Sequence, residues 1–374
     1  MTAHEPLFVS TSIDYPIDDL NLSFSDYIAR SRTLITQARA DLDSQDASAI
    51  IDANSPFELR PASPTKQGVL LIHGLLDSPC ALKEIGLHLQ ASGYLVRAIL
   101  LPGHGTIPGH LLSIHYEQWQ QAVRYGVASL AKDLDEITLV GASTGATLSL
   151  LYASQHPEKI KSLVLLVPAI QIKSGLARFA KWLTLLGKHW PRALWFTKNP
   201  DEITHHTKYS SIPFNAIDQV YQLTELLKSS SPPKVPVFYC ISEDDATVSA
   251  KAALDYFKKD TQPESRLLLY SRQSRAIDDR RIILRASTYS ALHIRDFSHI
   301  GISLPIPTPC PVSPNTIYGE FNDINLAIRN RLFQWHLLKN DCKRLTFNPD
   351  FDEMMRLIEQ FMVHSFPHAF PDKR

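Results

Sequence analysis

A serine between two glycines is the residue of this sequence whose surroundings predict chemistry most directly. Residues 141–145 read GASTG, which matches the pattern GxSxG around a nucleophilic serine. The apolar run 137–140 precedes the pattern, and a helix-forming stretch follows it. A sharp strand-to-helix turn exposes the hydroxyl group of Ser143, and the start of the helix supplies N–H groups beside it. We therefore predict that Ser143 is a nucleophile for acyl transfer.

The loop that follows the first strong apolar run predicts the groups that assist this nucleophile. Residues 73–79 read HGLLDSP. Attack on an acyl carbon makes the carbonyl oxygen negative, and two N–H groups must stabilise that oxygen. We expect the N–H of Thr144, which follows the nucleophile, to be one donor. The N–H of Leu75 is the other, because Gly74 allows the loop to turn tightly.

Two polar side chains of the same loop need separate interpretations. His73 lies where the strand meets the loop, so we expect a structural hydrogen-bonding residue rather than a base. Asp77 either shapes the loop or contacts the substrate, and both roles stay open at the level of the sequence.

Activation of a serine hydroxyl group requires a histidine base and an acid that orients the histidine. When the serine lies on a strand-to-helix turn, the acid and then the histidine follow it in the sequence. The acids that come directly after a strong strand are Glu243, Asp244 and Asp245, in CISEDDATVS. We choose Asp245 and keep Asp244 as the alternative.

The base must come from the late histidines, which are His293, His299, His336, His364 and His368. His299 lies just past a strand-like run and ahead of Gly301, where a loop residue can reach the serine. His293 lies inside the alternating run, and the last three fall on or near predicted terminal helices. We therefore predict that His299 is the base.

The arrangement of apolar runs predicts the fold that positions these residues. Four short runs, GVLLIHG, YLVRAILLPGHG, ITLVGAS and LVLLVPA, alternate with helical stretches, and residues 235–242 form a fifth. Continuous apolar strands that alternate with helices are typical of a parallel sheet covered on both faces. Residues 267–270, 281–287 and 291–297 compete to be the last strands. The fold class is α/β, with a mostly parallel, doubly wound sheet and an inserted helical cap.

The same pattern divides the chain. We expect an N-terminal extension over 1–60, the first part of the core over 61–169, a helical cap over 170–233, the second part of the core over 234–319 and C-terminal helices over 320–374. The extension shows helical spacing at Tyr27, Leu34 and Ala38, which indicates one amphipathic helix. Helical patterns also occur at about 323–338 and 352–364.

These motifs, in this order, resemble the serine hydrolases of the α/β-hydrolase fold, and most of all the carboxylesterase, monoglyceride lipase and lysophospholipase group. The matching stretches are HGLLDSP at 73–79, LPGHG at 101–105 followed by Trp119, GASTGA at 141–146, DATV at 245–248 and SH at 298–299. The resemblance implies a triad of Ser143, Asp245 and His299, with Leu75 and Thr144 as oxyanion donors. It covers about 68–302, and residues 271–289 look inserted.

The predicted activity is hydrolysis of carboxylic esters through an acyl-enzyme, with no cofactor and no metal. An acyltransferase, a thioesterase or an amidase would use the same triad, and a non-catalytic binding protein would keep only the fold. His205 and His206 do not indicate a metal site, because neighbouring side chains diverge and no set of other ligands lies near them in the sequence.

The cap segment suggests what the substrate looks like. Residues 170–200 contain three tryptophans and six lysines or arginines, but no aspartate or glutamate. We expect an apolar acyl pocket with Leu76, Trp182 and Leu186 as substrate-binding residues. The basic tryptophan-containing face either contacts anionic lipid surfaces or covers the active site with its lysines solvated, and both interpretations stay open.

Composition excludes other classes of function. Of 374 residues, 44% are hydrophobic, and 38 basic residues balance 38 acidic ones. A neutral chain has no overall positive field for nucleic acid, so we expect no nucleic-acid partner. The four cysteines form no CxxC pair, which argues against a structural zinc site. The N-terminus shows no signal peptide and no run suits a membrane span, so we expect a cytoplasmic protein.

Overall fold

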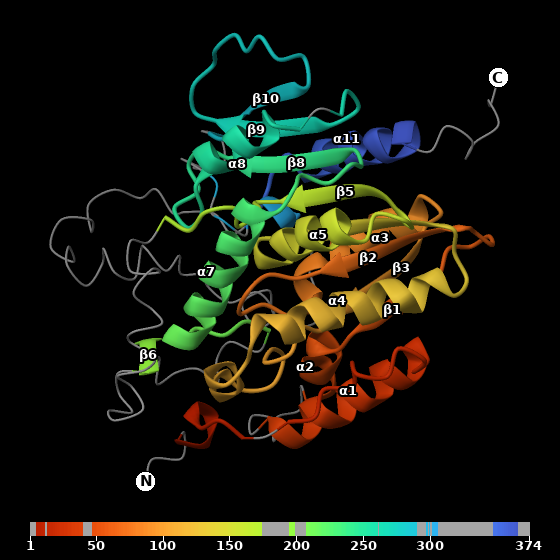
Figure 1. Cartoon of the computed structure of the whole chain (residues 1–374), viewed down its shortest axis with the longest axis vertical. Helices are drawn as coiled ribbons and strands as arrows, with labels where there is room; N and C mark the ends of the chain where they lie inside the picture. Colours follow the sequence, from red (N-terminus) through yellow and green to blue (C-terminus); the bar gives the residue numbers. More distant parts are fainter. Residues whose placement is uncertain are drawn as a thin grey trace, which may run out of the picture.

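The computed structural model describes residues 5–11, 13–39, 47–173, 194–198, 207–260, 262–289, 297, 299, 301–305 and 347–365. An eight-stranded sheet forms its centre, in the order β1-β3-β2-β4-β5-β8-β9-β10 (Figure 1). The strands are β1 (Phe57–Leu59), β2 (Gln67–Ile72), β3 (Leu95–Ile99), β4 (Glu136–Ala142), β5 (Ile160–Leu166), β8 (Val237–Ser242), β9 (Arg266–Ser271) and β10 (Ile282–Ala286). All neighbours are parallel except β1 and β3.

The sheet register brings the strand ends that carry the predicted motifs to one edge. Ile72 at the end of β2 pairs with Gly141, and Gly141 pairs with Leu165 on β5. Leu166 then pairs with Cys240 on β8. The turns after β2, β4 and β8 therefore lie beside one another, as expected for ligand sites in parallel sheets. The predicted α/β fold with a mostly parallel sheet is confirmed.

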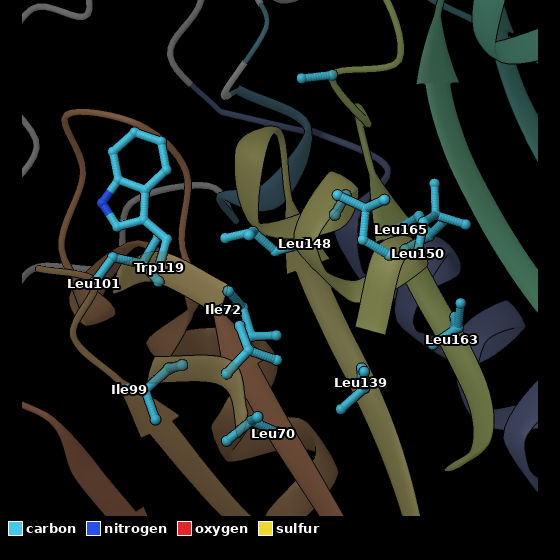
Figure 2. Packing of buried hydrophobic residues seen from close by; sticks show 14 of the residues in the cluster. Leu70, Ile72, Ile99, Leu101, Trp119, Leu139, Leu148, Leu150, Leu163 and Leu165 are labelled. Atoms are coloured by element: carbon cyan, nitrogen blue, oxygen red, sulfur yellow. The ribbon is translucent and has the colours of Figure 1, made fainter. Parts of the chain in front are cut away.

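Helices cover both faces of the sheet. The larger hydrophobic cluster joins the strands to α4 (Tyr116–Ala131), α5 (Thr144–Gln155), α7 (Phe214–Ser229) and α8 (Ala250–Phe257). The second cluster joins the opposite face to α3 (Lys83–Ala91) and α11 (Phe351–Ser365). Figure 2 shows part of the first cluster, where Leu70, Leu139 and Leu163 come from neighbouring strands and share one face. Successive strand residues alternate between the two clusters, so each strand is apolar on both faces.

The N-terminal segment is more structured than the sequence predicted. The expected helix is present as α1 (Phe24–Ala38), and α2 (Ala47–Asn54) and the edge strand β1 follow it. The Tyr27 hydroxyl group donates to the Leu100 carbonyl at 3.2 Å and accepts from the Leu100 N–H at 3.0 Å. Arg97 on β3 pairs with Glu58 on β1 at 2.7 Å. These contacts attach residues 24–59 to the edge of the sheet beside β3.

The described residues also form short 3-10 helical turns, one near the N-terminus and three in loops between longer elements. They are η1 (Glu5–Phe8), η2 (Pro79–Leu82), η3 (Pro108–Leu112) and η8 (Gly301–Ser303). Within residues 170–233, the segment expected to form a cap, the described residues form β6 (Trp195–Thr197) and β7 (Ile212–Pro213), which pair antiparallel, and then α7. Trp182 and Leu186 lie outside the described residues, as do residues 291–296 of the strand expected at 291–297 and the helix expected at 323–338. The helix expected at 352–364 is present as α11.

Residues 271–289, which looked inserted, form the edge of the sheet. β10 pairs parallel with β9, from Ile282 opposite Leu267 to Ala286 opposite Ser271. Arg285 on β10 pairs with Glu353 on α11 at 3.0 Å. In the ranges that the structure describes, no helix combines the length and apolar character that a membrane crossing requires.

Candidate active site

Ser143 occupies the turn between β4 and α5 in a conformation that few residues adopt. Its φ is 52° and its ψ is −114°, so the backbone is strained there. A Cβ on Gly141 would lie 2.4 Å from the Gly145 carbonyl oxygen, and a Cβ on Gly145 would lie 2.1 Å from the Ile72 carbonyl oxygen. Both positions therefore require glycine. The Ser143 N–H donates to the Leu166 carbonyl at 2.9 Å, which fixes the turn against β5.

The three predicted catalytic side chains lie in a continuous hydrogen-bonded series. His299 Nε2 lies 2.9 Å from Ser143 Oγ, and His299 Nδ1 lies 2.5 Å from Asp245 Oδ2. A carboxylate only accepts hydrogen bonds, so Nδ1 donates to Asp245 and Nε2 is left to accept from the serine hydroxyl group. Asp245 Oδ1 accepts from the N–H groups of Thr247 at 2.8 Å and Val248 at 3.1 Å. The arrangement suits a serine nucleophile with a histidine base.

The surroundings of Asp245 favour its ionised form. Burial alone would raise the pKa of this carboxyl group. The neighbouring His299 and the hydrogen bonds from His299, Val248 and Thr247 act in the opposite direction, and the net effect lowers the pKa of Asp245. The carboxylate is therefore charged at neutral pH and can hold the imidazole ring in one tautomer.

The neighbouring acids pair with side chains of residues 271–289 instead. Asp244 Oδ1 accepts from Arg272 Nε at 2.6 Å, and Asp244 Oδ2 accepts from the Ser287 hydroxyl group at 2.6 Å. Glu243 forms an ion pair with Arg275. Geometry thus separates the two alternatives for the acid, because Asp245 contacts His299 and Asp244 contacts residues 271–289. No pattern in the sequence indicated these contacts of Glu243 and Asp244, because they join side chains that are far apart in the chain.

The two predicted oxyanion donors flank the nucleophile. Thr144 is the first residue of α5, and its N–H, like that of Leu75, donates to no other residue in the described ranges. A Cβ on Gly74 would lie 3.2 Å from the Ser143 Cβ, so the loop passes close to the serine. Leu76 has a φ of 70°, is 5% exposed and belongs to the larger core cluster. Its contact with substrate stays a prediction.

His73 joins the two loops that border the site. Its Nδ1–H donates to the Gly74 carbonyl at 2.8 Å, and its Nε2 accepts from the Leu101 N–H at 3.0 Å. Burial and the neighbouring His104 lower the pKa of His73 well below its usual value. Both ring nitrogens are engaged away from Ser143, which agrees with the structural role expected from the sequence.

His104 and Trp119 continue this buried network. His104 Nδ1 lies 3.1 Å from the Pro102 carbonyl oxygen, and Trp119 Nε1 donates to the same oxygen at 2.9 Å. Burial lowers the pKa of His104 to about 4, with the hydrogen bonds to Pro102 and Leu101 opposing that shift. The LPGHG loop is thus held by neutral histidines in the interior.

Lys173, at the start of the cap, is a residue that the sequence analysis missed. Its ammonium group donates to the Asp245 carbonyl oxygen, and its N–H donates to the Thr247 carbonyl at 3.0 Å. Ile172 and Val248 form an antiparallel bridge beside it. The first residues of the cap are therefore attached to the turn that carries the acid.

Across the described ranges, no group of three or more His, Cys, Asp or Glu residues is arranged to hold a metal ion, and His205 and His206 lie outside those ranges.

The sheet and the geometry around Ser143 are those of a serine hydrolase with the α/β-hydrolase fold. A family model described as "Serine aminopeptidase, S33" (Hydrolase_4) matches residues 63–273, more than half of the chain, and the chain belongs to this family.

Curated relatives and solved structures agree with this assignment. The chain is 27% identical over 188 residues to a thermostable monoacylglycerol lipase of Bacillus sp. (strain H-257), covering 48% of this chain and 71% of that protein. It is 22% identical over 236 residues to a carboxylesterase of Bacillus subtilis (strain 168). This match covers 62% of this chain and 94% of that protein. The structure of Est1E from Butyrivibrio proteoclasticus with ferulic acid bound is similar in fold, with a TM-score of 0.50, 13% identity and coverage of 83% of this chain and 95% of that one.

The buried histidines predict how stability depends on pH. Because the folded state lowers the pKa of His104 to about 4, the unfolded chain binds more protons once the pH falls below about 6.5. The contribution of His104 to stability is fully present above that pH and is lost as the pH falls toward 4. We expect His104→Phe to reduce the loss of unfolding free energy between pH 7 and pH 5.5 by about 1 kcal/mol. Urea unfolding at pH 7 and at pH 5.5 measures the unfolding free energy of both proteins. If the wild-type protein and His104→Phe lost the same unfolding free energy between the two pH values, the lowered pKa of His104 would be contradicted.

Proposed function

We propose that this chain hydrolyses carboxylic esters through an acyl-enzyme formed on Ser143. The observation that carries the proposal is the hydrogen-bonded series from Ser143 Oγ through His299 to Asp245 at the strand-to-helix turn. In it, Ser143 is the nucleophile, His299 is the general base and Asp245 orients the imidazole ring.

The geometry supports a two-step reaction. Ser143 Oγ bonds to the acyl carbon while its proton passes to His299 Nε2. The carbonyl oxygen takes the negative charge and accepts hydrogen bonds from the N–H groups of Leu75 and Thr144. The ester bond then breaks, and the proton on Nε2 passes to the departing alcohol. A water molecule, deprotonated by His299, releases the acid from the acyl-enzyme by the same steps.

Two considerations favour esters among acyl substrates. The matched relatives are named as a monoacylglycerol lipase and a carboxylesterase, although the family description names an aminopeptidase. The cap sequence is also rich in leucine and tryptophan, which suits an apolar acyl group. Within this proposal, Leu76, Trp182 and Leu186 contact the acyl chain.

A fluorophosphonate probe tests the nucleophile. We expect the wild-type protein to react covalently and Ser143→Ala to lose the labelling, because the probe needs a serine activated by a base. Mass spectrometry of the labelled protein locates the modified residue, and hydrolysis of p-nitrophenyl esters gives a parallel measurement. A wild-type protein that neither reacts nor hydrolyses esters would indicate a non-catalytic member of the fold.

Paired variants test the acid. Asp245→Asn reverses the hydrogen bond to His299 Nδ1 and places the ring in the wrong tautomer, so we expect kcat to fall by about 10³- to 10⁴-fold. Asp244→Asn weakens only the contacts with Arg272 and Ser287, so we expect a loss below about tenfold. Steady-state kinetics on one p-nitrophenyl ester compares the two. A larger loss of kcat in Asp244→Asn than in Asp245→Asn would indicate that Asp244 is the acid.

We also propose that the basic face of the cap contacts anionic lipid surfaces. Replacing Lys181, Lys188 and Arg192 by glutamine removes three positive charges, and each is worth about 1 kcal/mol near an anionic surface. We expect binding to vesicles that contain phosphatidylglycerol to weaken more than tenfold in a sedimentation assay. The matched control replaces the exposed Lys251, Lys258 and Lys259 of the α8 region in the same way. Equal vesicle binding by the wild-type protein and the cap variant would contradict the proposed contact with anionic lipid surfaces.

A further inference from the structure

Residues 167–173, which lead from β5 into the segment expected to form the cap, contact the main chain of two members of the predicted triad. The Ala169 N–H donates to the Ser143 carbonyl at 3.2 Å. Four residues later, the ammonium group of Lys173 donates to the Asp245 carbonyl. One short segment therefore connects the turn that carries the nucleophile to the turn that carries the acid.

The start of this segment is held firmly by its surroundings. Val167 has a φ of 43°, a conformation that β-branched residues rarely adopt. Its N–H donates to the Cys240 carbonyl on β8 at 2.8 Å, and its side chain is buried in the second hydrophobic cluster. The Thr147 hydroxyl group donates to the Ala169 carbonyl at 2.9 Å. A strained residue persists only where several contacts determine its conformation, so the path of the chain is fixed where it leaves the sheet.

The end of the segment pairs with the residues that follow the acid. Residues 171–173 lie antiparallel to residues 247–249, and the Ser249 N–H donates to the Gln171 carbonyl at 2.8 Å. The main chain of Lys173 is part of this pairing. The Lys173 side chain therefore starts from a fixed position beside the turn that carries the acid.

The carbonyl group that Lys173 contacts belongs to the peptide that sets the direction of the Asp245 carboxylate. Asp245 Oδ1 accepts from the N–H groups of Thr247 and Val248, so the side chain folds back onto the main chain that follows it. A rotation of the peptide after Asp245 would displace those N–H groups and the carboxylate with them. The bond from the ammonium group is charge-assisted, and it opposes this rotation. It thereby holds the carboxylate at the position where it contacts His299.

The exposure of Lys173 separates a positioning role from a stabilising one. The residue is exposed, and the polar contacts of exposed lysines contribute little to the free energy of unfolding. Catalysis is more sensitive, because a displacement of about 1 Å in a catalytic site can lower the rate about 10²-fold. We propose that Lys173 is a positioning residue that acts through Asp245 and keeps its carboxylate aligned with His299. This inference rests on the proposed ester hydrolysis.

Two substitutions at residue 173 test the positioning role. Lys173→Met keeps the aliphatic stem and removes the donor, so we expect kcat for p-nitrophenyl butyrate to fall about tenfold. KM should change less than about twofold, because Asp245 and His299 act in both steps of the reaction and Lys173 does not contact the substrate. Lys173→Arg keeps a charged donor, so its kcat should stay within about threefold of the wild-type value. The midpoint of urea unfolding should be nearly the same in all three proteins.

Lys159 provides the matched control. It is also exposed, and its ammonium group donates to the carbonyl groups of Ala131 at 3.1 Å and Leu134 at 3.3 Å. These residues precede β4 and β5, at the opposite edge of the sheet from Ser143. Lys159→Met should therefore keep the wild-type kcat.

The rate at which a fluorophosphonate labels Ser143 gives a second measurement. Labelling depends on the activated serine but requires no release of an acyl group. We expect this rate to fall about tenfold in Lys173→Met and to stay unchanged in Lys159→Met.

The outcomes separate this inference from the proposed function. Equal kcat values in Lys173→Met and Lys159→Met would overturn the role of Lys173, while ester hydrolysis would stand. A loss of kcat that Lys173→Arg shares, or one that accompanies a lower unfolding midpoint, would indicate a different role for Lys173 and would also overturn the inference. If the wild-type protein neither hydrolysed the ester nor reacted with the fluorophosphonate, the proposed function itself would be overturned.

Discussion

The close approach of two backbone segments at Gly145 is the constraint on which the site depends. The start of α5 packs so tightly against the Ile72 carbonyl that no side chain fits at Gly145. This contact holds α5 directly behind the turn at which Ser143 adopts its positive φ. Thr144 is the first residue of α5, so its N–H has no intrahelical acceptor. The strain at the serine is sustained by the parallel register of β2, β4 and β5, which fixes both ends of the turn.

The sequence predicted the features that depend on local pattern. The continuous apolar runs that became β2, β4, β5 and β8 are unambiguous, because a strand buried on both faces has no polar alternation. The glycines around Ser143 marked the turn for the same local reason. His299 followed from elimination among the late histidines, and the structure brings its ring to Ser143 and Asp245.

Features that depend on pairing between distant segments could not be predicted from the sequence. β1 is three residues long and has no apolar run of its own, so only its pairing with β3 defines it. The bond from Lys173 to the Asp245 carbonyl joins residues 72 positions apart, and nothing near Lys173 marks it as part of the site.

Residues 271–289 supply the positive charges that the acidic turn after β8 needs. Three consecutive acids, 243–245, crowd negative charge onto one short turn, and mutual repulsion would push protons onto them and weaken the orienting carboxylate. Arg275 pairs with Glu243 and Arg272 pairs with Asp244, so Asp245 is the acid of the three that faces the imidazole ring. The acidic run 243–245 and the two arginines of residues 271–289 are thus electrostatically coupled. Without Arg272 and Arg275, Glu243 and Asp244 would lose their ion-pair partners on the same turn as Asp245.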